Sequence, residues 1–98
     1  MILLLGGSGV LGHALQEKFH SHEITLVDRG DVMKWMGKDG SSSIEAFIER
    51  LPVKPSLILN AAGMTNPLAL ESELLAANYQ LPANLISAGK CNEVRIVT

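Results

Sequence analysis

The feature that most limits how this chain can fold is a cluster of glycines directly after a short apolar run at its N-terminus. Met1-Ile2-Leu3-Leu4-Leu5 is followed at once by Gly6-Gly7-Ser8-Gly9-Val10-Leu11-Gly12, which satisfies both G-x-x-G-x-x-G and G-x-G-x-x-G. Glycines at these spacings let a chain reverse sharply after a strand and let the next helix pack close to it, because no Cβ obstructs either. The sequence therefore predicts a strand, a glycine turn and a helix in direct succession.

The first turn of the predicted helix offers backbone N–H groups, foremost those of Val10 and Leu11, that have no partner within the helix. These donors and the positive end of the helix dipole favour an anion such as a pyrophosphate. A tight turn that binds nothing is the alternative, but a strand before, an amphipathic helix after and a second strand next are the context that dinucleotide binding requires. The residues expected to line the pyrophosphate are Gly6, Gly7, Ser8, Gly9, Val10, Leu11 and Gly12.

Short apolar runs alternate with helical patterns along the rest of the chain, which is typical of βαβ units and a parallel sheet. The patterns predict strands over residues 2–5, 23–27, 56–60 and 93–98, and helices over 10–21, 41–51 and 71–89. Ser41-Ser42-Ser43 is expected to cap the second helix, Pro82 to start or bend the third, and Gly89 to follow its last turn. Residues 31–40 fit either a helical turn or a short irregular strand.

These elements predict an α/β fold, a Rossmann-type three-layer sandwich with a parallel sheet of about five strands in the order 3-2-1-4-5. The 98 residues leave no room for a second domain. Residues 1–98 are expected to form one dinucleotide-binding domain, equivalent to the N-terminal half of a Rossmann arrangement. The ligand is expected across the switch point between the first and fourth strands.

Asp28 ends the second predicted strand, about 20 residues beyond the glycines, where a carboxylate accepts hydrogen bonds from the hydroxyls of an adenosine ribose. An unpaired carboxylate there favours NAD, because it repels the 2′-phosphate of NADP. Arg29 leaves NADP open, since a guanidinium beside that position pairs with a phosphate. Asp28-Arg29-Gly30 is also a common turn sequence without any ligand.

Composition and charge exclude several other classes of partner. The formal net charge of −2 is spread along the chain with no basic run, which argues against nucleic acid. The apolar N-terminal run is far shorter than the ~20 residues that span a bilayer, so no membrane partner is expected. Cys91 is the only cysteine, which excludes an internal disulfide and favours a cytoplasmic protein. No metal site is expected, because His20 and His22 lie at a predicted helix-to-strand turn where a solvated loop is favoured.

Asn60-Ala61-Ala62-Gly63 and Asn78 follow the glycine turn and Asp28 in order along the chain. With them, the chain resembles the extended short-chain dehydrogenase/reductase superfamily, in its NAD-dependent epimerase/dehydratase group. The segment from Ile58 to Thr65 and the later Glu71-Ser72-Glu73, Pro82 and Asn84-Leu85 look most like dTDP-4-dehydrorhamnose reductases. The resemblance runs through the whole chain but matches only the N-terminal portion of such proteins.

The resemblance implies NAD or NADP as cofactor and adds residues to the expected site. The turn of Asn60, Ala61, Ala62 and Gly63 would line the ribose and nicotinamide side. Asn78 would support the central strand or take part in a water relay. An equal alternative is that Asn78 is only a polar helix residue whose side chain bonds to backbone. Asp39 would match an acidic residue near the adenine amino group, although the surrounding segment departs from the family pattern.

The catalytic residues of that family are not expected in this chain. They are a Ser or Thr shortly after the last strand, a segment that Thr98 would reach at most, and a Tyr-x-x-x-Lys pair on the next helix. Tyr79 is followed four residues on by Ala83, so it does not fit the pair. The chain is therefore expected to be the NAD(P)-binding portion of an oxidoreductase or sugar-nucleotide epimerase/reductase, truncated and inactive alone, its activity requiring a missing C-terminal portion.

Two other functions are kept as alternatives. One is a stand-alone NAD(P)-binding or sensing module without catalysis. The other is a non-functional fragment whose last strand exposes an unpaired edge and pairs with a second copy to form a homodimer.

Overall fold

The apolar N-terminal run forms a central strand of a parallel sheet in a computed structural model of the protein, which describes residues 1–63 and 70–98. The strands in the described residues are β1 (Ile2–Leu5), β2 (Ile24–Leu26), β3 (Leu57–Asn60) and β4 (Arg95–Val97). They pair in the order β2-β1-β3-β4, each pair parallel. All four residues of β1 are buried, as expected for a parallel strand that is covered on both faces.

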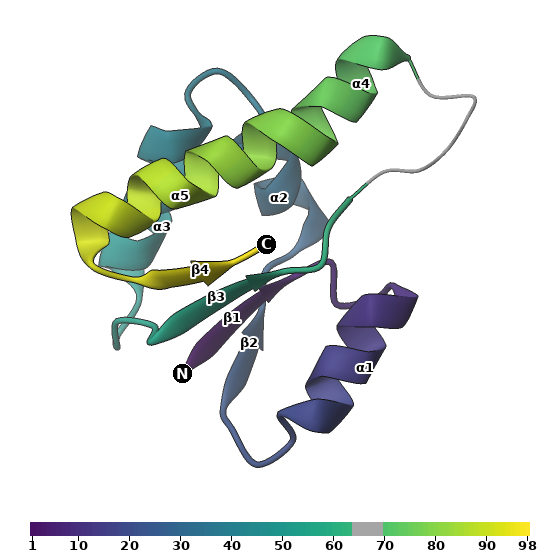
Figure 1. The fold of residues 1–98 in the computed structure, drawn as a ribbon. Coiled ribbons are helices and arrows are strands. Elements are labelled where there is room, and N and C mark those ends of the chain that lie inside the picture. Colours follow the sequence, from purple (N-terminus) through teal and green to yellow (C-terminus); the bar gives the residue numbers. More distant parts are fainter. Residues whose placement is uncertain (64–69) are drawn as a thin grey trace.

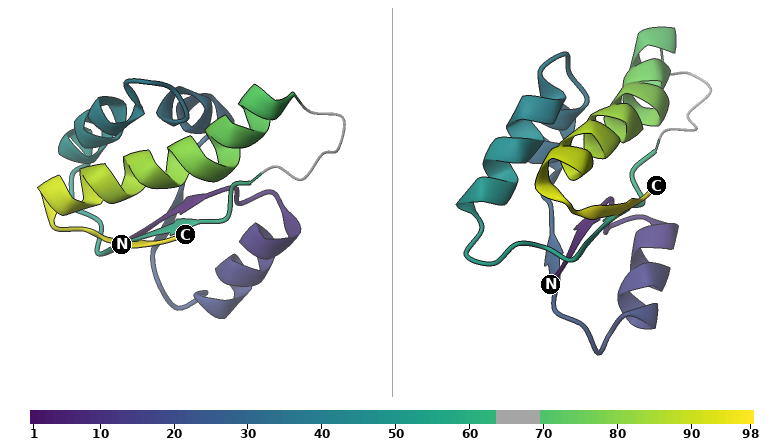
Figure 2. Two further views of the ribbon diagram at one scale, coloured as in Figure 1. Left: turned by 45° about the horizontal axis from the view of Figure 1, so that its top comes forward. Right: turned by 60° about the vertical axis from the view of Figure 1, so that its left-hand side comes forward.

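Helices cover both faces of the sheet and make three layers (Figures 1 and 2). The helices of the described residues are α1 (Val10–Lys18), α2 (Arg29–Trp35), α3 (Gly40–Arg50), α4 (Glu71–Leu75), the π-helical η1 (Ala76–Gln80) and α5 (Leu81–Asn92). In Figure 1, α1 lies on one face, whereas α2, α3 and α5 lie on the other. The predicted fold class, a Rossmann-type three-layer sandwich, is confirmed.

The predicted strand order is corrected, because the described residues contain no strand outside β2. The order 3-2-1-4-5 required one there, but the chain turns into α2 directly after β2. Asp28 occupies the N-cap position of α2, and its side chain accepts a hydrogen bond from the Asp31 N–H. Val32 and Trp35, three residues apart on this helix, are both buried, so one turn of helix places them in the core. The first half of the ambiguous stretch, up to Trp35, is thus helical, residues 36–39 connect α2 to α3, and β2 is an edge strand among the described residues.

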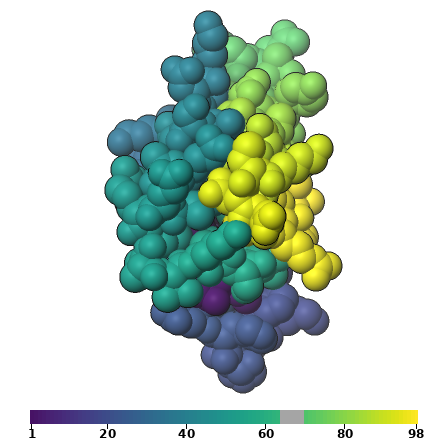
Figure 3. Space-filling model, turned by 90° about the vertical axis from the view of Figure 1, so that its left-hand side faces the viewer, coloured from purple at the N-terminus to yellow at the C-terminus, as the bar shows by residue number. Residues whose placement is uncertain are grey.

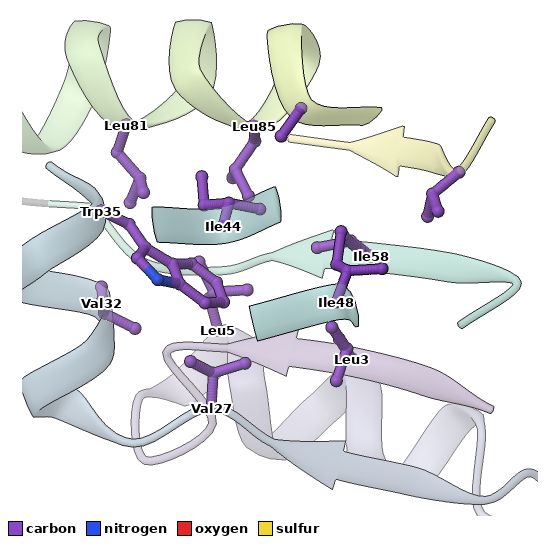
Figure 4. Packing of buried hydrophobic residues seen from close by; sticks show 12 residues of the cluster. Leu3, Leu5, Val27, Val32, Trp35, Ile44, Ile48, Ile58, Leu81 and Leu85 are labelled. Atoms are coloured by element: carbon purple, nitrogen blue, oxygen red, sulfur yellow. The ribbon is translucent and has the colours of Figure 1, made fainter. Parts of the chain in front are cut away.

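The two faces of the sheet carry separate apolar clusters, as the alternation of side chains along each strand requires. Leu3, Leu5 and Ile58 join Trp35 and the inward residues of α3 and α5 in the larger cluster (Figure 4). Ile2, Leu4 and Leu59 form the smaller one beneath α1, against Leu15 and Phe19. The sheet therefore holds α1 on one side and the three-helix layer on the other.

Two predicted helix boundaries are corrected by long-range packing. Helix α3 begins at Gly40, so Ser41, Ser42 and Ser43 lie within its first turn and do not cap it; Asp39 holds the N-cap position without a side-chain capping bond. Helix α5 continues past Gly89 and ends where Glu93 adopts a left-handed conformation, with φ 55°. Gly89 is instead a packing position, since a Cβ there would lie 2.7 Å from the side chain of Ile96.

The helix that follows residue 70 is not interrupted at Pro82 but widens before it. The π-helical η1 leads into α5, where Pro82 is in the first turn. Proline lacks an N–H and clashes with the carbonyl four residues earlier in an α-helix. A π-helical turn shifts that pairing by one residue, so the long helix passes the proline without a break, as Figure 2 shows.

Asn84, on α5, is a buried polar side chain that ties this helix to the α2–α3 connection. Its Nδ2 donates to the carbonyl oxygens of Trp35 at 2.8 Å and Gly37 at 3.0 Å, and its Oδ1 accepts from Gln80 Nε2 at 2.9 Å. A Cβ on Gly40 would overlap the Trp35 carbonyl and the Asn84 amide. The glycine at the start of α3 is thus required by the close approach of both the Trp35 carbonyl and the Asn84 side chain.

Asn84→Ala should lower the free energy of unfolding by about 2 kcal/mol, because the buried Trp35 carbonyl and the partly buried Gly37 carbonyl lose their donor. Urea denaturation measures this. Asn92→Ala is the matched control, since Asn92 Nδ2 donates to the Ala88 carbonyl of its own helix and its loss should cost under about 1 kcal/mol. Equal losses in the two variants would contradict the assigned role of Asn84.

Candidate functional site

The carboxyl ends of β1 and β3 lie side by side and continue into two turns that touch. Leu5 is in register with Asn60, and the Ala61 N–H donates to the Leu5 carbonyl at 3.0 Å. The chain leaves β1 toward β2 on one side and leaves β3 toward β4 on the other. This is the switch point of the sheet, the place where ligands bind in open α/β folds.

Gly6 and Gly12 are glycines because the turn has no room for a side chain. Gly6 has φ 73°, and a Cβ on it would lie 2.7 Å from the Ala61 carbonyl carbon and from the Ala62 nitrogen. A Cβ on Gly12 would overlap the Gly6 carbonyl and the Gly7 backbone. These two positions therefore set how closely β1, α1 and the turn after β3 approach one another.

Gly9 is different, because the fold does not need a glycine there. Its backbone is extended, with φ −82° and ψ 174°, and a Cβ would meet only the Gly6 oxygen, at an ordinary 3.7 Å. Gly9 is the N-cap residue of α1 and has no side chain to satisfy the N–H groups of the first turn. Ser8, Gly9, Val10 and Leu11 are all exposed, with Val10 91% accessible. The turn therefore presents accessible backbone, including N–H groups of the first turn of α1, at the switch point of the sheet.

Gln16 is a residue of this site that the sequence patterns did not single out. Its Nε2 donates to the Gly7 carbonyl at 2.9 Å and to the Gly12 carbonyl at 3.3 Å. The side chain is half-buried and lies back along the first turn of its own helix. The sequence did contain one signal for this role: Gln16 is a polar residue one helical turn after Gly12, on a half-buried face of the helix.

Asp28 and Arg29 lie at the same edge of the sheet as the glycine turn. The strand β2 pairs with β1, with Leu26 in register with Leu4 and the Val27 N–H donating to the Leu4 carbonyl at 2.9 Å. Both Asp28 and Arg29 are exposed. Asp28 Oδ1 accepts from the Asp31 N–H at 2.9 Å, so this carboxylate has a capping role in the fold whatever else it binds.

Asn60 shapes the turn that follows β3. Its Oδ1 accepts from the Ala62 N–H at 3.0 Å and its Nδ2 donates to Thr98 Oγ1 at 2.9 Å. Gly63 is exposed, and a Cβ on it would lie 3.4 Å from Asn78 Oδ1. The structure thus brings together, beside the glycine turn, Asn60, Ala61, Ala62, Gly63 and Asn78. Met64 and Thr65, which belong to the segment that resembles the family, lie outside the described residues.

Asp39 is not brought to this group. It is an exposed residue on the α2–α3 connection, which lies remote from the glycine turn in all ribbon views (Figures 1 and 2). The connection is fixed in that place by its hydrogen bonds to Asn84. The adenine contact implied for Asp39 stays a prediction that this arrangement does not favour.

Two shallow hollows lie away from the glycine turn. One, of about 400 Å³, lies between the ends of α3 and α5 and is lined in part by Ile48 and Cys91. The other, of about 640 Å³, lies between α5 and β4 and is lined in part by Ile86 and Ile96. Neither includes Gly6–Gly12 or Asn60–Gly63, so the candidate site is an open edge and not one of these hollows.

Residues 1–63 and 70–98 contain neither a metal-ligand cluster nor a membrane-spanning helix. No group of three or more His, Cys, Asp and Glu side chains there is placed to hold a metal ion. His20 Nδ1 is 2.9 Å from the Glu17 carbonyl, and the His22 ring packs on Phe19. No helix in those ranges has the length and apolar character that crossing a bilayer requires.

Helices α3 and α5 lie side by side on one surface of the molecule (Figure 3). Cys91, exposed near the end of α5, lies close to Glu45 of α3. A hydrogen bond to the Glu45 carboxylate, then the charge of that carboxylate, raise the pKa of the Cys91 thiol. A raised pKa keeps the thiol protonated and weakly nucleophilic. Cys91 is thus not an activated cysteine.

The parallel order β2-β1-β3-β4 and the glycine turn at its switch point define a Rossmann-type α/β fold. Among solved structures, the chain is similar to a dTDP-4-dehydrorhamnose reductase of Clostridium acetobutylicum, with 24% identity and a TM-score of 0.79 over 99% of this chain and 34% of that one. It is also similar to a mutated uronate dehydrogenase, with 20% identity and a TM-score of 0.64 over 97% of this chain and 37% of that one. A Listeria innocua protein gives 22% identity and a TM-score of 0.63 over 98% of this chain and 50% of that one.

The chain therefore spans between 34% and 50% of the length of these proteins. The structural resemblance predicted from the sequence is confirmed at the level of the fold. No protein-family model and no curated protein matches the chain.

Glu45→Gln should make Cys91 react faster with iodoacetamide near neutral pH, because removal of the carboxylate lowers the thiol pKa toward its ordinary value. The difference should vanish at a pH high enough to ionise both thiols. Alkylation rates followed by mass spectrometry across this pH range measure the effect. Glu49→Gln removes the same charge one turn further along α3 and serves as control; an equal acceleration in both variants would contradict the assignment to Glu45.

Proposed function

We propose that this chain binds a nicotinamide dinucleotide, NAD in preference to NADP, with the pyrophosphate on the glycine turn. The observation that carries the proposal is Gly9, a glycine that the fold does not require, on an exposed turn at the switch point of the sheet. A Cβ there would meet only the Gly6 oxygen, at an ordinary 3.7 Å, and would occupy space that a closely approaching phosphate would need. A glycine that serves a ligand and not the fold has this geometry.

The proposed pose uses the N–H groups of the first turn of α1. Those of Val10, Leu11 and Gly12 precede the first helical donor, the His13 N–H, which bonds the Gly9 carbonyl at 2.9 Å. No side chain in the described residues caps this turn, and the helix dipole favours an anion there. The nine residues of α1 carry no acidic side chain in their first turn to oppose it.

The two ends of the dinucleotide would lie on either side of this turn. The adenosine ribose would reach Asp28 at the end of β2, with Arg29 as the group that would meet a 2′-phosphate. The nicotinamide side would lie against the small residues Ala61, Ala62 and Gly63, which follow β3. Asn60 fixes the shape of this wall through the Ala62 N–H, and Asn78 stands beside Gly63.

We further propose that the parent activity is an NAD(P)-dependent oxidoreductase or sugar-nucleotide epimerase/reductase reaction, with the nicotinamide ring supplying the hydride chemistry when bound. The fold shared with a reductase and a dehydrogenase supports this class. In the described residues, Tyr79 is 70% exposed on η1 and Ala83 stands where a partner lysine would be needed. Tyr79 therefore does not form a Tyr-x-x-x-Lys pair, and the role that we propose for this chain is cofactor binding.

Gly9→Ala should weaken NAD binding at least about ten-fold, because displacing even one hydrogen bond to a charged phosphate costs about 1.5–3 kcal/mol. Its free energy of unfolding should fall by less than about 1 kcal/mol, the usual cost of alanine at an N-cap. Isothermal titration and urea denaturation measure the two quantities. Gly12→Ala is the contrasting variant and should lose about 1–3 kcal/mol of stability through overlap with Gly6 and Gly7. A fully folded Gly9→Ala that binds NAD as wild type would refute the proposed site.

Asp28→Asn separates the two roles of the Asp28 carboxylate. Asparagine caps a helix as well as aspartate does, so the unfolding midpoint should stay near wild type, whereas Asp28→Ala should cost about 1 kcal/mol. The ratio of NAD to NADP affinity should fall about ten-fold in Asp28→Asn, because the ribose loses a charged acceptor and the 2′-phosphate loses a repelling charge. Parallel titrations with both dinucleotides measure the ratio. NAD affinity that is unchanged in Asp28→Ala would rule out the ribose contact.

A further inference from the structure

The side chain of Gln16 reaches back over the glycine turn and binds two of its carbonyl groups. Nε2 lies 2.9 Å from the Gly7 oxygen and 3.3 Å from the Gly12 oxygen. A carboxamide has two N–H donors on one nitrogen, so one group holds both ends of the segment between these glycines. The Gly7 carbonyl belongs to no strand or helix, and in the described residues Gln16 is the partner recorded for it.

The direction of the Gly7 carbonyl decides the direction of the Ser8 N–H. Both groups belong to one planar trans peptide unit, in which C=O and N–H point to opposite sides. Because Gln16 holds the oxygen on the α1 side, the Ser8 N–H points away from Gln16. Ser8 is exposed, so a donor that points away from Gln16 is placed to meet a ligand at the turn that leads into the first turn of α1.

Without Gln16, the peptide between Gly7 and Ser8 has little to hold it. Glycine adopts positive and negative φ about equally well, and Gly7 follows Gly6, which already has φ 73°. A rotation of this peptide would exchange the positions of its oxygen and its N–H. An anion at the turn would then face a carbonyl oxygen in place of a donor.

We propose that Gln16 is a positioning residue for the pyrophosphate of the bound dinucleotide: it fixes the Gly7–Ser8 peptide so that the Ser8 N–H becomes a donor to the phosphate. The inference rests on the proposed function and deepens it, since it names a side chain that acts on the ligand only through the backbone. It also extends the anion site from the first turn of α1 into the turn before the helix.

Gln16→Met tests the proposal, because methionine has a similar length and suits a half-buried position but has no donor. The variant should bind NAD and inorganic pyrophosphate each about ten-fold more weakly, as expected for the loss of one hydrogen bond to a charged group. Chemical-shift titration of the ¹⁵N-labelled chain, at a temperature where each variant is fully folded, gives both affinities. In wild type, the Ser8 amide resonance should move with added pyrophosphate, and in Gln16→Met that movement should be largely lost.

Gln80→Met is the matched control. Gln80 also donates from Nε2, to Asn84 Oδ1 at 2.9 Å, but it lies on η1 and braces the α2–α3 connection through Asn84. This variant should lose stability and keep wild-type affinity for both probes. A merely structural role of Gln16 would instead predict the same behaviour for Gln16→Met.

The outcomes separate the inference from the proposed function. If wild type binds both probes and Gln16→Met binds them equally well, the positioning role is overturned and the proposed function stands. A loss limited to NAD, with pyrophosphate binding intact, or an equal loss in Gln80→Met also overturns the positioning role. If wild type binds neither NAD, NADP nor pyrophosphate, the proposed function falls and the inference falls with it.

Discussion

The contact between Gly6 and the Ala61–Ala62 peptide is the constraint on which the rest of the structure depends. The last paired residues of β1 and β3 are Leu5 and Asn60. Beyond them, the backbone of Gly6 still lies against the backbone of Ala61 and Ala62, because no side chain separates the two chains. Helix α1 then starts close enough to the turn for Gly12 to pack on Gly6 and Gly7. Everything proposed for the site, from the N–H groups of α1 to the wall after β3, lies within reach of this contact. A larger residue at position 6 would move all of these groups apart at once.

Those parts of the fold that depend on local sequence were predictable. The apolar runs at 2–5 and 56–60 became β1 and β3 with nearly the expected bounds, because buried parallel strands read as short continuous apolar segments. The glycine turn and α1 followed from spacing alone. The missing outer strand was not predictable, since nothing local shows that Trp35 and Val32 will be buried by α3 and α5 and not exposed on a strand. The start of α3 at Gly40 likewise depends on Asn84, distant in the chain.

The candidate site likewise contains residues that the sequence predicted and one, Gln16, that it did not. Residues placed by the strands, namely the glycine turn, Asp28 and Asn60, lie at one edge as their positions in the pattern predict. The role of Gln16 was not predictable from the sequence, because its side chain contacts the Gly7 carbonyl only when residues 10–18 have formed a helix. Asp39 was proposed on resemblance and lies on a different connection, because α2 replaces the strand that would have led there. A motif fixes what the backbone can do locally, whereas side chains that act across the fold need the fold itself.

The position of β2 at the edge of the sheet has a kinetic consequence. In the described residues no strand lies beyond it, so no strand of that part of the chain would cover the outer flank of a dinucleotide that extends toward Asp28 as proposed. Differences in affinity between related complexes arise mostly from the rate of dissociation, and an open flank lowers the barrier to leaving. A dinucleotide bound as proposed would therefore be expected to exchange with the surrounding solution, as a co-substrate does, and not to stay permanently bound.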